Sequence, residues 1–211
     1  MFDVTKQKTK ADIPQELLDV VTEKYRSQIQ VPNNKPLHQF LLCPVGLVGA
    51  GKTTVIKPLS KKLDLVRVST DEIRIILKQK GYNYSGVRDI SYKVAKYFLD
   101  QGYSVAIDAN CGTDETRRYI EEIAKKYQLP TIWLRVNPPD DFVVHKLQNF
   151  KHTWLFENGN EAVKAYFEYK KHHGDYAKSD IPFTYTFDTS KSDLPEQIKI
   201  AEKLIREKLK I

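Results

Sequence analysis

The segment Gly46–Thr54 matches the pattern G-x-x-x-x-G-K-[ST], which is typical of loops that bind nucleotide phosphates. Its residues are Gly46, Leu47, Val48, Gly49, Ala50, Gly51, Lys52, Thr53 and Thr54. Glycines let several backbone N–H groups point toward one anion, and a helix that starts near Lys52 would add its positive dipole end. We therefore expect Lys52 to reach the β and γ phosphates, Thr53 to ligate Mg²⁺ and Thr54 to lie near the α-phosphate. The alternative is a glycine-rich turn whose lysine faces solvent.

A second candidate metal ligand, Asp108, follows the apolar run Ser104–Ile107. A carboxylate at the end of a buried strand beside a phosphate loop can bind Mg²⁺ or its water ligands. Strands also end in aspartate simply because this residue favours turns. The phosphate loop upstream favours the metal role for Asp108.

The segment Ser69–Arg74 could supply the group that activates a phosphate acceptor. Asp71 would lie at the ligand-binding edge of the sheet, where its carboxylate can accept the proton of an attacking hydroxyl. Arg74, three residues later on the same helix face, could hold an anionic group of the acceptor. The alternative is structural: Ser69 and Glu72 form an S-x-x-E capping box, Asp71 favours the helix dipole, and Arg74 pairs with Asp71.

Short apolar runs alternate with longer helical patterns after residue 37, which predicts an α/β fold with a largely parallel sheet between helices. The expected strands are residues 38–43, 65–68, 104–107, 130–136 and 182–187. The expected helices are residues 52–62, 71–80, 87–101, 114–127, 139–150, 160–173 and 195–210. Ligands bind beyond the carboxyl ends of the strands in such sheets, and the three candidate segments all lie there.

The chain has 211 residues, 41% of them hydrophobic, and a formal charge of +7. This length and composition fit one folded domain and exclude an intrinsically disordered polymer. The longest apolar run, Phe40–Val48, is interrupted by Pro44 and Gly46 and is shorter than the roughly 20 residues of a membrane span. The polar N-terminus lacks the features of a secretion signal. We therefore expect a cytoplasmic protein in which Cys43 and Cys111 are reduced and buried.

Residues 1–37 are expected to form an extension with a charged tail, an amphipathic helix over residues 14–29 and a linker rich in proline and asparagine. Apolar residues at helical spacing form one stripe on this helix: Leu17, Leu18, Val21, Tyr25 and Ile29. An amphipathic helix usually covers the core of its own domain, so we expect it to pack on residues 38–211. Docking of a partner protein is the alternative.

Other classes of nucleotide-binding protein fit poorly. GTPases read guanine with an N-K-x-D element, but this chain has only Asn34–Leu37, upstream of the phosphate loop, and no D-x-x-G follows Asp108. An ABC-type signature is missing, and the length leaves little room for the accessory regions of motor ATPases. A small kinase remains.

The combination of motifs resembles the polynucleotide kinase and zeta-toxin group of small kinases in the P-loop NTPase superfamily, which also includes antibiotic, sugar and aminoacyl-tRNA kinases. The four segments that carry the resemblance are Gly46–Thr54, Ser69–Arg74, Val105–Asn110 and Thr113–Arg118. The resemblance implies a three-layer α/β/α sandwich with a five-stranded parallel sheet in the order 2-3-1-4-5. It also implies a kinase domain over residues 38–211 with a helical lid near residues 139–182. ATP and Mg²⁺ would be the cofactors, and a γ-phosphoryl group would pass to a hydroxyl. Asp71 would be the general base and Arg74 an acceptor-binding residue.

The lid departs from the pattern of this group. Its members usually carry lid arginines that stabilise charge on the moving phosphoryl group, but this chain has no arginine between Arg135 and Arg206. Lys151 occupies the matching position, with Lys146 as a second candidate. Lysine offers a point charge rather than a planar fork, so the clamp would be less geometric. We expect Lys151 to close over the transferred group.

The acceptor is less constrained by the sequence. The excess of positive charge lies in residues 38–136, which favours an anionic acceptor, nucleic acid included. Tyr82 and Tyr84 lie in a loop bounded by glycines, where they could stack on bases or pack internally. The leading acceptor is the 5′-hydroxyl of a nucleic acid or a nucleotide-like molecule. The alternatives are a sugar or antibiotic acceptor, and a non-catalytic regulatory module that binds ATP.

Overall fold

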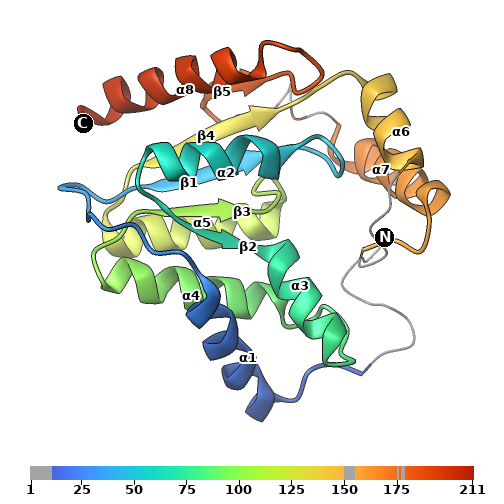
Figure 1. Ribbon diagram of the computed structural model, residues 1–211, viewed down its shortest axis with the longest axis horizontal. Coiled ribbons are helices and arrows are strands. Elements are labelled where there is room, and N and C mark those ends of the chain that lie inside the picture. Colours follow the sequence, from blue (N-terminus) through green and yellow to red (C-terminus); the bar gives the residue numbers. More distant parts are fainter. Residues whose placement is uncertain (1–10, 150–154, 175, 177–178) are drawn as a thin grey trace.

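The computed structural model describes residues 11–149, 155–174, 176 and 179–211, and its strands form one five-stranded sheet. The strands are β1 (Leu41–Val45), β2 (Val66–Ser69), β3 (Val105–Asp108), β4 (Thr131–Val136) and β5 (Phe183–Phe187). All neighbouring strands run parallel, in the order β2-β3-β1-β4-β5 (Figure 1). The expected fold class and strand order are therefore confirmed.

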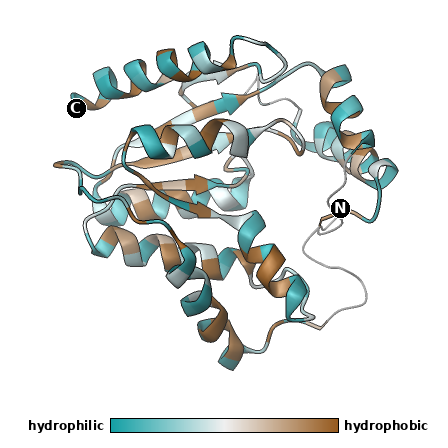
Figure 2. Cartoon of the chain, in the orientation of Figure 1, coloured by the Kyte–Doolittle hydropathy of each residue, from teal (hydrophilic) through white to brown (hydrophobic). Residues whose placement is uncertain are grey.

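Helices cover both faces of this sheet. Those of the described residues are α1 (Gln15–Gln28), α2 (Lys52–Lys62), α3 (Thr70–Gln79), α4 (Val87–Asp100), α5 (Asp114–Tyr127), α6 (Asp140–Gln148), α7 (Gly159–His173) and α8 (Leu194–Leu209). Side chains alternate along β1, so Leu42 packs with α2 and α8, whereas Leu41 and Cys43 pack in the cluster that includes α1, α3, α4 and α5. Figure 2 shows hydrophobic colouring along the strands and both colours on the helices, as expected for helices that cover a buried sheet.

The helix bounds agree closely with the sequence pattern, and the largest difference concerns the first strand. The sequence predicts this strand over residues 38–43, but β1 spans Leu41–Val45, so it both begins and ends later than expected. Proline has no N–H group to donate, but its carbonyl can still accept, and the Pro44 carbonyl accepts a hydrogen bond of 2.9 Å from the Cys111 N–H. The strand therefore carries the chain directly into the phosphate-loop motif.

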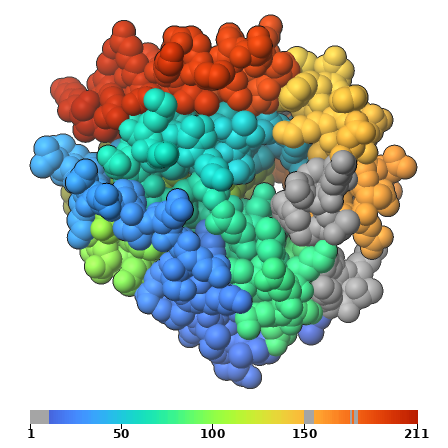
Figure 3. Space-filling view, in the orientation of Figure 1, coloured from blue at the N-terminus to red at the C-terminus, as the bar shows by residue number. Residues whose placement is uncertain are grey.

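The amphipathic helix of the N-terminal extension packs against α3 and α4, as its apolar stripe predicts (Figure 3). Leu18, Val21 and Tyr25 are buried in the core cluster, and Leu17 and Ile29 pack at its margin. No helix of the described residues is both long and apolar enough to cross a membrane.

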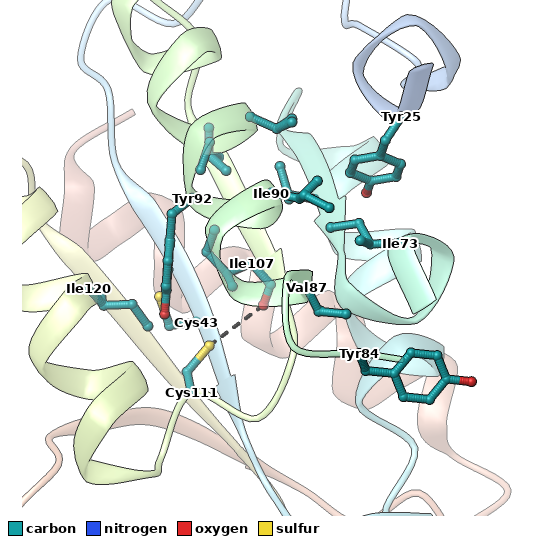
Figure 4. Close-up of a cluster of buried hydrophobic side chains, with 14 of the residues drawn as sticks. Tyr25, Cys43, Ile73, Tyr84, Val87, Ile90, Tyr92, Ile107, Cys111 and Ile120 are labelled. Carbon is teal, nitrogen blue, oxygen red and sulfur yellow. Dashed lines mark hydrogen bonds between the residues drawn. The ribbon is translucent and has the colours of Figure 1, made fainter. Parts of the chain in front are cut away.

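Both cysteines are free and buried, as expected. The Cys111 thiol donates to the Ile107 carbonyl at 3.7 Å, and Figure 4 shows Cys43 beside it in the same cluster. Burial raises the pKa of the Cys111 thiol well above its usual value. This thiol is therefore protonated at neutral pH and is a poor nucleophile.

Candidate active site

The loop between β1 and α2 contains the phosphate-loop motif at the carboxyl edge of the sheet. Gly51 precedes α2 in the left-handed region, with φ at 94°, which disfavours any residue with a Cβ. At Gly46 the constraint is space, because a Cβ there would lie 2.4 Å from the Val136 carbonyl oxygen. Thr189, in the segment between β5 and α8, donates to the Ala50 carbonyl at 2.7 Å and holds the loop from the other side. Glycine is therefore required at position 51 by the backbone conformation and at position 46 by close packing.

Lys52 does not extend into solvent. Its ammonium Nζ donates to the carbonyl oxygens of Gly46 and Leu47, at 2.9 Å each, so the side chain folds back over its own loop. Burial lowers the pKa of Lys52, and the charges of Asp71 and Asp108 act in the opposite direction. The negative charges of Asp71 and Asp108, which come from two other segments of the chain, therefore favour the charged form of Lys52.

Asp108 ends β3 and is almost fully buried, with 2% of its side chain exposed. Its Oδ1 accepts from the Thr53 hydroxyl at 3.0 Å, and its Oδ2 accepts from Arg67 Nη1 at 2.6 Å. Burial raises the pKa of Asp108, against the lowering effect of Arg67. The two predicted metal ligands, Thr53 and Asp108, are thus in direct contact, and their oxygens are of the kind that Mg²⁺ prefers.

Arg67 was not identified from the sequence as a site residue. It lies between the buried valines of β2 and bridges Asp108 to Glu72, which it also contacts. The signal in the sequence was an arginine in the middle of a short apolar strand. Arg67 alternates along β2 with the buried positions Val66 and Val68. Only the pairing of β2 with β3 shows that the Arg67 guanidinium lies beside Asp108.

Asp71 and Arg74, in the first turns of α3, form an ion pair. Arg74 Nη1 donates to Asp71 Oδ1 at 2.6 Å and to Thr70 Oγ1 at 3.1 Å. Among the described residues, the buried Nε of Arg74 has no hydrogen-bond partner. The pairing agrees with the structural alternative, but Ser69 makes no side-chain capping bond, so its half of the predicted capping box is not formed.

Asn110, in the loop after β3, connects three parts of the site. Its Oδ1 accepts from the N–H groups of Gly46 at 3.3 Å and of Gly112 at 3.2 Å. Its Nδ2 donates to the Tyr176 hydroxyl at 2.8 Å. Tyr176 lies beyond the end of α7 and was not identified from the sequence as a site residue. This amide therefore links the phosphate loop to the chain that returns from the helical pair α6 and α7.

The two lid candidates have different outcomes. Lys146 lies in α6, and its ammonium donates to the Gly49 carbonyl at 3.3 Å. Lys151, the preferred candidate, lies outside the described residues. Asp140 at the start of α6 pairs with Lys170 and accepts from the Tyr166 hydroxyl, which ties α6 to α7.

The two loop tyrosines, Tyr82 and Tyr84, both pack against the same core cluster. Tyr84 is 1% exposed and packs in the core cluster, so no ring face is accessible for stacking, which agrees with the packing alternative. Figure 4 labels Tyr84 among the buried side chains of this cluster. Tyr82 is partly buried against the same cluster.

Gly46→Ala tests the close packing of the phosphate loop. We expect a loss of about 1–3 kcal/mol in the free energy of unfolding, because the added methyl group meets a backbone oxygen that cannot rotate away. Urea denaturation followed by circular dichroism measures this change. Stability equal to that of the wild type would contradict the contact.

Comparisons with known proteins agree with this geometry. Residues 41–165 match the AAA domain family. Comparison with curated proteins gave no match. A candidate kinase from Chloroflexus aurantiacus j-10-fl has a similar structure, with a TM-score of 0.62 and 20% sequence identity over 78% of this chain and 97% of that one.

Two further solved structures are similar. One belongs to the PezAT toxin–antitoxin system of Streptococcus pneumoniae, with a TM-score of 0.60 and 12% identity over 93% of this chain and 98% of that one. The other is the APS kinase of Mycobacterium tuberculosis in complex with AMPPNP and APS, with a TM-score of 0.51 and 16% identity over 81% and 99%. At these low sequence identities, the structural similarity shows the fold alone, which is the fold of P-loop kinases. Because the family match covers more than half of the sequence, the chain belongs to the AAA domain family.

Proposed function

We propose that the chain is an ATP-dependent kinase that transfers the γ-phosphoryl group of ATP to a hydroxyl of a small molecule. The kinase domain would span residues 38–211, with the lid near residues 139–182. The resemblance of its motifs to the polynucleotide kinase and zeta-toxin group supports this proposal. One observation carries the proposal: Lys52, the Thr53–Asp108 pair and Asp71 lie at the ends of parallel neighbouring strands, and therefore at the carboxyl edge of one sheet. This is the edge at which such sheets bind ligands.

The phosphate loop would bind the polyphosphate of ATP. The N–H groups at the start of α2, from Gly51 to Thr54, would donate to phosphate oxygens, and the helix dipole favours the same charge. Lys52 would exchange the carbonyls of Gly46 and Leu47 for the β and γ phosphates. This exchange is favourable because a neutral acceptor is replaced by a charged one, and charge-assisted hydrogen bonds are roughly twice as strong.

Thr53 and Asp108 fit a magnesium site, since a hydroxyl and a carboxylate oxygen lie 3.0 Å apart beside the loop. Bound Mg²⁺ would neutralise charge on the phosphates. Arg67 holds the other carboxylate oxygen of Asp108 and would keep the first one directed at the site. One carboxylate with a hydroxyl is a usual protein contribution to a magnesium site that is completed by phosphates and water.

Asp71 would act as the general base. In the reaction the acceptor oxygen forms a bond to the γ-phosphorus, the bond from that phosphorus to the β,γ-bridging oxygen breaks, and the hydroxyl proton passes to the Asp71 carboxylate. Arg74 now holds Asp71 Oδ1 at 2.6 Å. A polar acceptor would bind the Arg74 guanidinium, whose buried Nε has no hydrogen-bond partner within the described part of the chain. It would thereby release the Asp71 carboxylate for proton transfer. Lys146 and Lys151 would supply positive charge from the lid.

Two observations favour a small acceptor over a nucleic acid. The internal packing of Tyr84 removes one of the two rings that could stack on bases. Several arginines of residues 38–136 already bind carboxylates, so these guanidinium groups are engaged and do not offer themselves directly to the phosphates of a polyanion: Arg67 with Asp108, Arg74 with Asp71, Arg88 with Glu115, and Arg117 with Asp180. The sequence-based preference for a nucleic-acid 5′-hydroxyl therefore gains no support.

An acceptor screen tests this proposal. The full chain is incubated with γ-labelled ATP and Mg²⁺, together with either a panel of sugars, aminoglycosides and nucleosides or an oligonucleotide with a free 5′-hydroxyl. We expect label transfer to a member of the panel and none to the oligonucleotide. Transfer to the oligonucleotide, with binding that weakens steeply as salt increases, would instead support the nucleic-acid acceptor. Tight ATP binding without transfer in any arm would indicate a regulatory module.

A further inference from the structure

The N-terminal helix α1 contacts the beginning of the segment that carries Asp71. The Ser69 N–H donates to the Tyr25 hydroxyl oxygen at 2.6 Å, and both residues are buried. Because β2 is the edge strand of the sheet that the described residues form, its outward N–H groups have no neighbouring strand there to bind, and a buried one needs another acceptor. The Tyr25 hydroxyl is that acceptor for Ser69, which lies one residue before the start of α3 and two residues before Asp71.

The same extension also holds the chain beyond the other end of α3. The Asn83 N–H donates to the Ala11 carbonyl at 3.0 Å, and Asn83 Nδ2 donates to Asp12 Oδ1 at 2.5 Å. Close packing adds to these bonds, since a Cβ at Gly86 would lie 2.7 Å from a methyl carbon of Ile13. Figure 3 shows the surface of α1 lying directly against that of α3. The helix that carries Asp71 and Arg74 is thus held at both ends by residues 11–25.

The Tyr25 hydroxyl also lies within the charged network of the site. Glu72, Arg67 and Asp108 all influence its ionisation, and burial raises the pKa of Tyr25 above its usual value. The hydroxyl therefore stays neutral and can accept from Ser69 without adding a charge. Ser69 is itself in register with Asp108 on the neighbouring strand, so one hydrogen bond fixes the chain beside both proposed functional carboxylates.

Covering the core does not by itself require this hydroxyl. Leu18 and Val21 on the same helix are buried without any polar group, and a phenylalanine would fill the place of the Tyr25 ring. Figure 4 shows Tyr25 extending from α1 toward the helix that contains Ile73. The polar tip of this side chain thus has a partner at the start of α3, in addition to the apolar contacts of its ring.

We propose that Tyr25 is a positioning residue for phosphoryl transfer, and that through it the N-terminal extension orients Asp71 toward the acceptor hydroxyl. This inference rests on the proposed kinase function. Helix α1 is then part of the acceptor side of the site, rather than an accessory segment or a free docking element for another protein.

Tyr25→Phe in the full chain tests the proposal, with Thr22→Val as the matched control. Thr22 is also buried on α1, but its hydroxyl donates within the helix, to the Leu18 carbonyl at 2.7 Å. Three quantities are measured: deuterium exchange of peptides covering residues 69–74, affinity for AMPPNP with Mg²⁺, and ATP turnover at saturating ATP. Turnover is measured with water as acceptor, or with the acceptor that the screen identifies.

We expect Tyr25→Phe to increase exchange over residues 69–74 at least threefold and to lower the saturating turnover about tenfold. The KM for ATP and the AMPPNP affinity should stay within about twofold of the wild type, since the phosphate loop is not touched. Thr22→Val should match the wild type in all three. A general loss of packing would instead lower nucleotide affinity, turnover and thermal stability together.

The proposal is overturned if Tyr25→Phe leaves either exchange or turnover at the wild-type level, or if Thr22→Val reproduces its effects. Should Tyr25→Phe fail to fold, Asp12→Ala releases the far end of α3, and unchanged exchange over residues 81–86 would overturn the two-ended attachment. A wild-type chain that binds no AMPPNP would reject the proposed function itself. In that case the exchange data still show whether Tyr25 holds α3, so the two failures are distinguishable.

Discussion

Asp71→Asn is expected to lower the rate of phosphoryl transfer by roughly two to four orders of magnitude, which is the usual contribution of a general base. Asparagine keeps the size of the side chain and can still accept a hydrogen bond from Arg74, but it cannot take the acceptor proton. AMPPNP affinity should change little, because Asp71 lies outside the phosphate loop. Single-turnover transfer from γ-labelled ATP measures the rate.

Asp89→Asn is the control for this change. Asp89 is also a carboxylate in the first turn of a helix, α4, and is exposed. Asp89→Asn should transfer the γ-phosphoryl group at the wild-type rate. The Asp71–Arg74 pair is partly exposed, with 41% of the Asp71 side chain accessible, so its loss should cost less than about 1 kcal/mol of stability. If transfer survives in Asp71→Asn while stability falls slightly, the carboxylate has only the structural role.

Lys52→Met is expected to weaken AMPPNP binding by about a hundredfold or more, since two charge-assisted hydrogen bonds to phosphate are lost. Thermal shift provides the measurement. At a ligand concentration about 100 times the wild-type Kd, binding stabilises the native state by about 2.7 kcal/mol. For a chain of this length, this corresponds to a rise in Tm of about 5–10 °C. Lys52→Met should show almost no rise in Tm at this ligand concentration.

Without nucleotide, Lys52→Met should have nearly the wild-type Tm. Removing the ammonium relieves the cost of burying a charge, but leaves the carbonyls of Gly46 and Leu47 without their donor, and the two effects oppose each other. Lys57→Met, at an exposed position of the same helix, is the control and should keep the full nucleotide-induced shift. A normal shift in Lys52→Met would show that the loop does not bind a nucleotide through this lysine.

The order of the elements could be read from the sequence because each is encoded locally. Helix α2 begins at Lys52, where the glycine motif predicts it, and α5 occupies the expected residues Asp114–Tyr127. Apolar periodicity is a property of neighbouring residues, so it survives without knowledge of the fold. The end of β1 was missed because local rules treat Pro44 as a breaker, whereas its carbonyl is paired by Cys111 from another part of the chain.

The candidate site was predicted less completely, because its residues act through pairs. The ion pair of Asp71 with Arg74 spans three positions on one helix and could be anticipated. The bridge from Arg67 to Asp108, and that from Asn110 to Tyr176, join segments 41 and 66 residues apart. Spacing within a motif carries no information about such contacts.

The sequence by itself determined the phosphate-loop motif, the α/β alternation and the edge of the sheet at which the functional side chains gather, since these depend on local spacing and on a handedness that parallel sheets share. Only the tertiary structure decided which charges neutralise one another and that Tyr25 reaches Ser69. Hydrogen bonds and ion pairs form only when their atoms lie within a few ångströms of each other. Strand register and helix packing bring residues that are distant in the sequence to such distances, and these exist only in the folded chain.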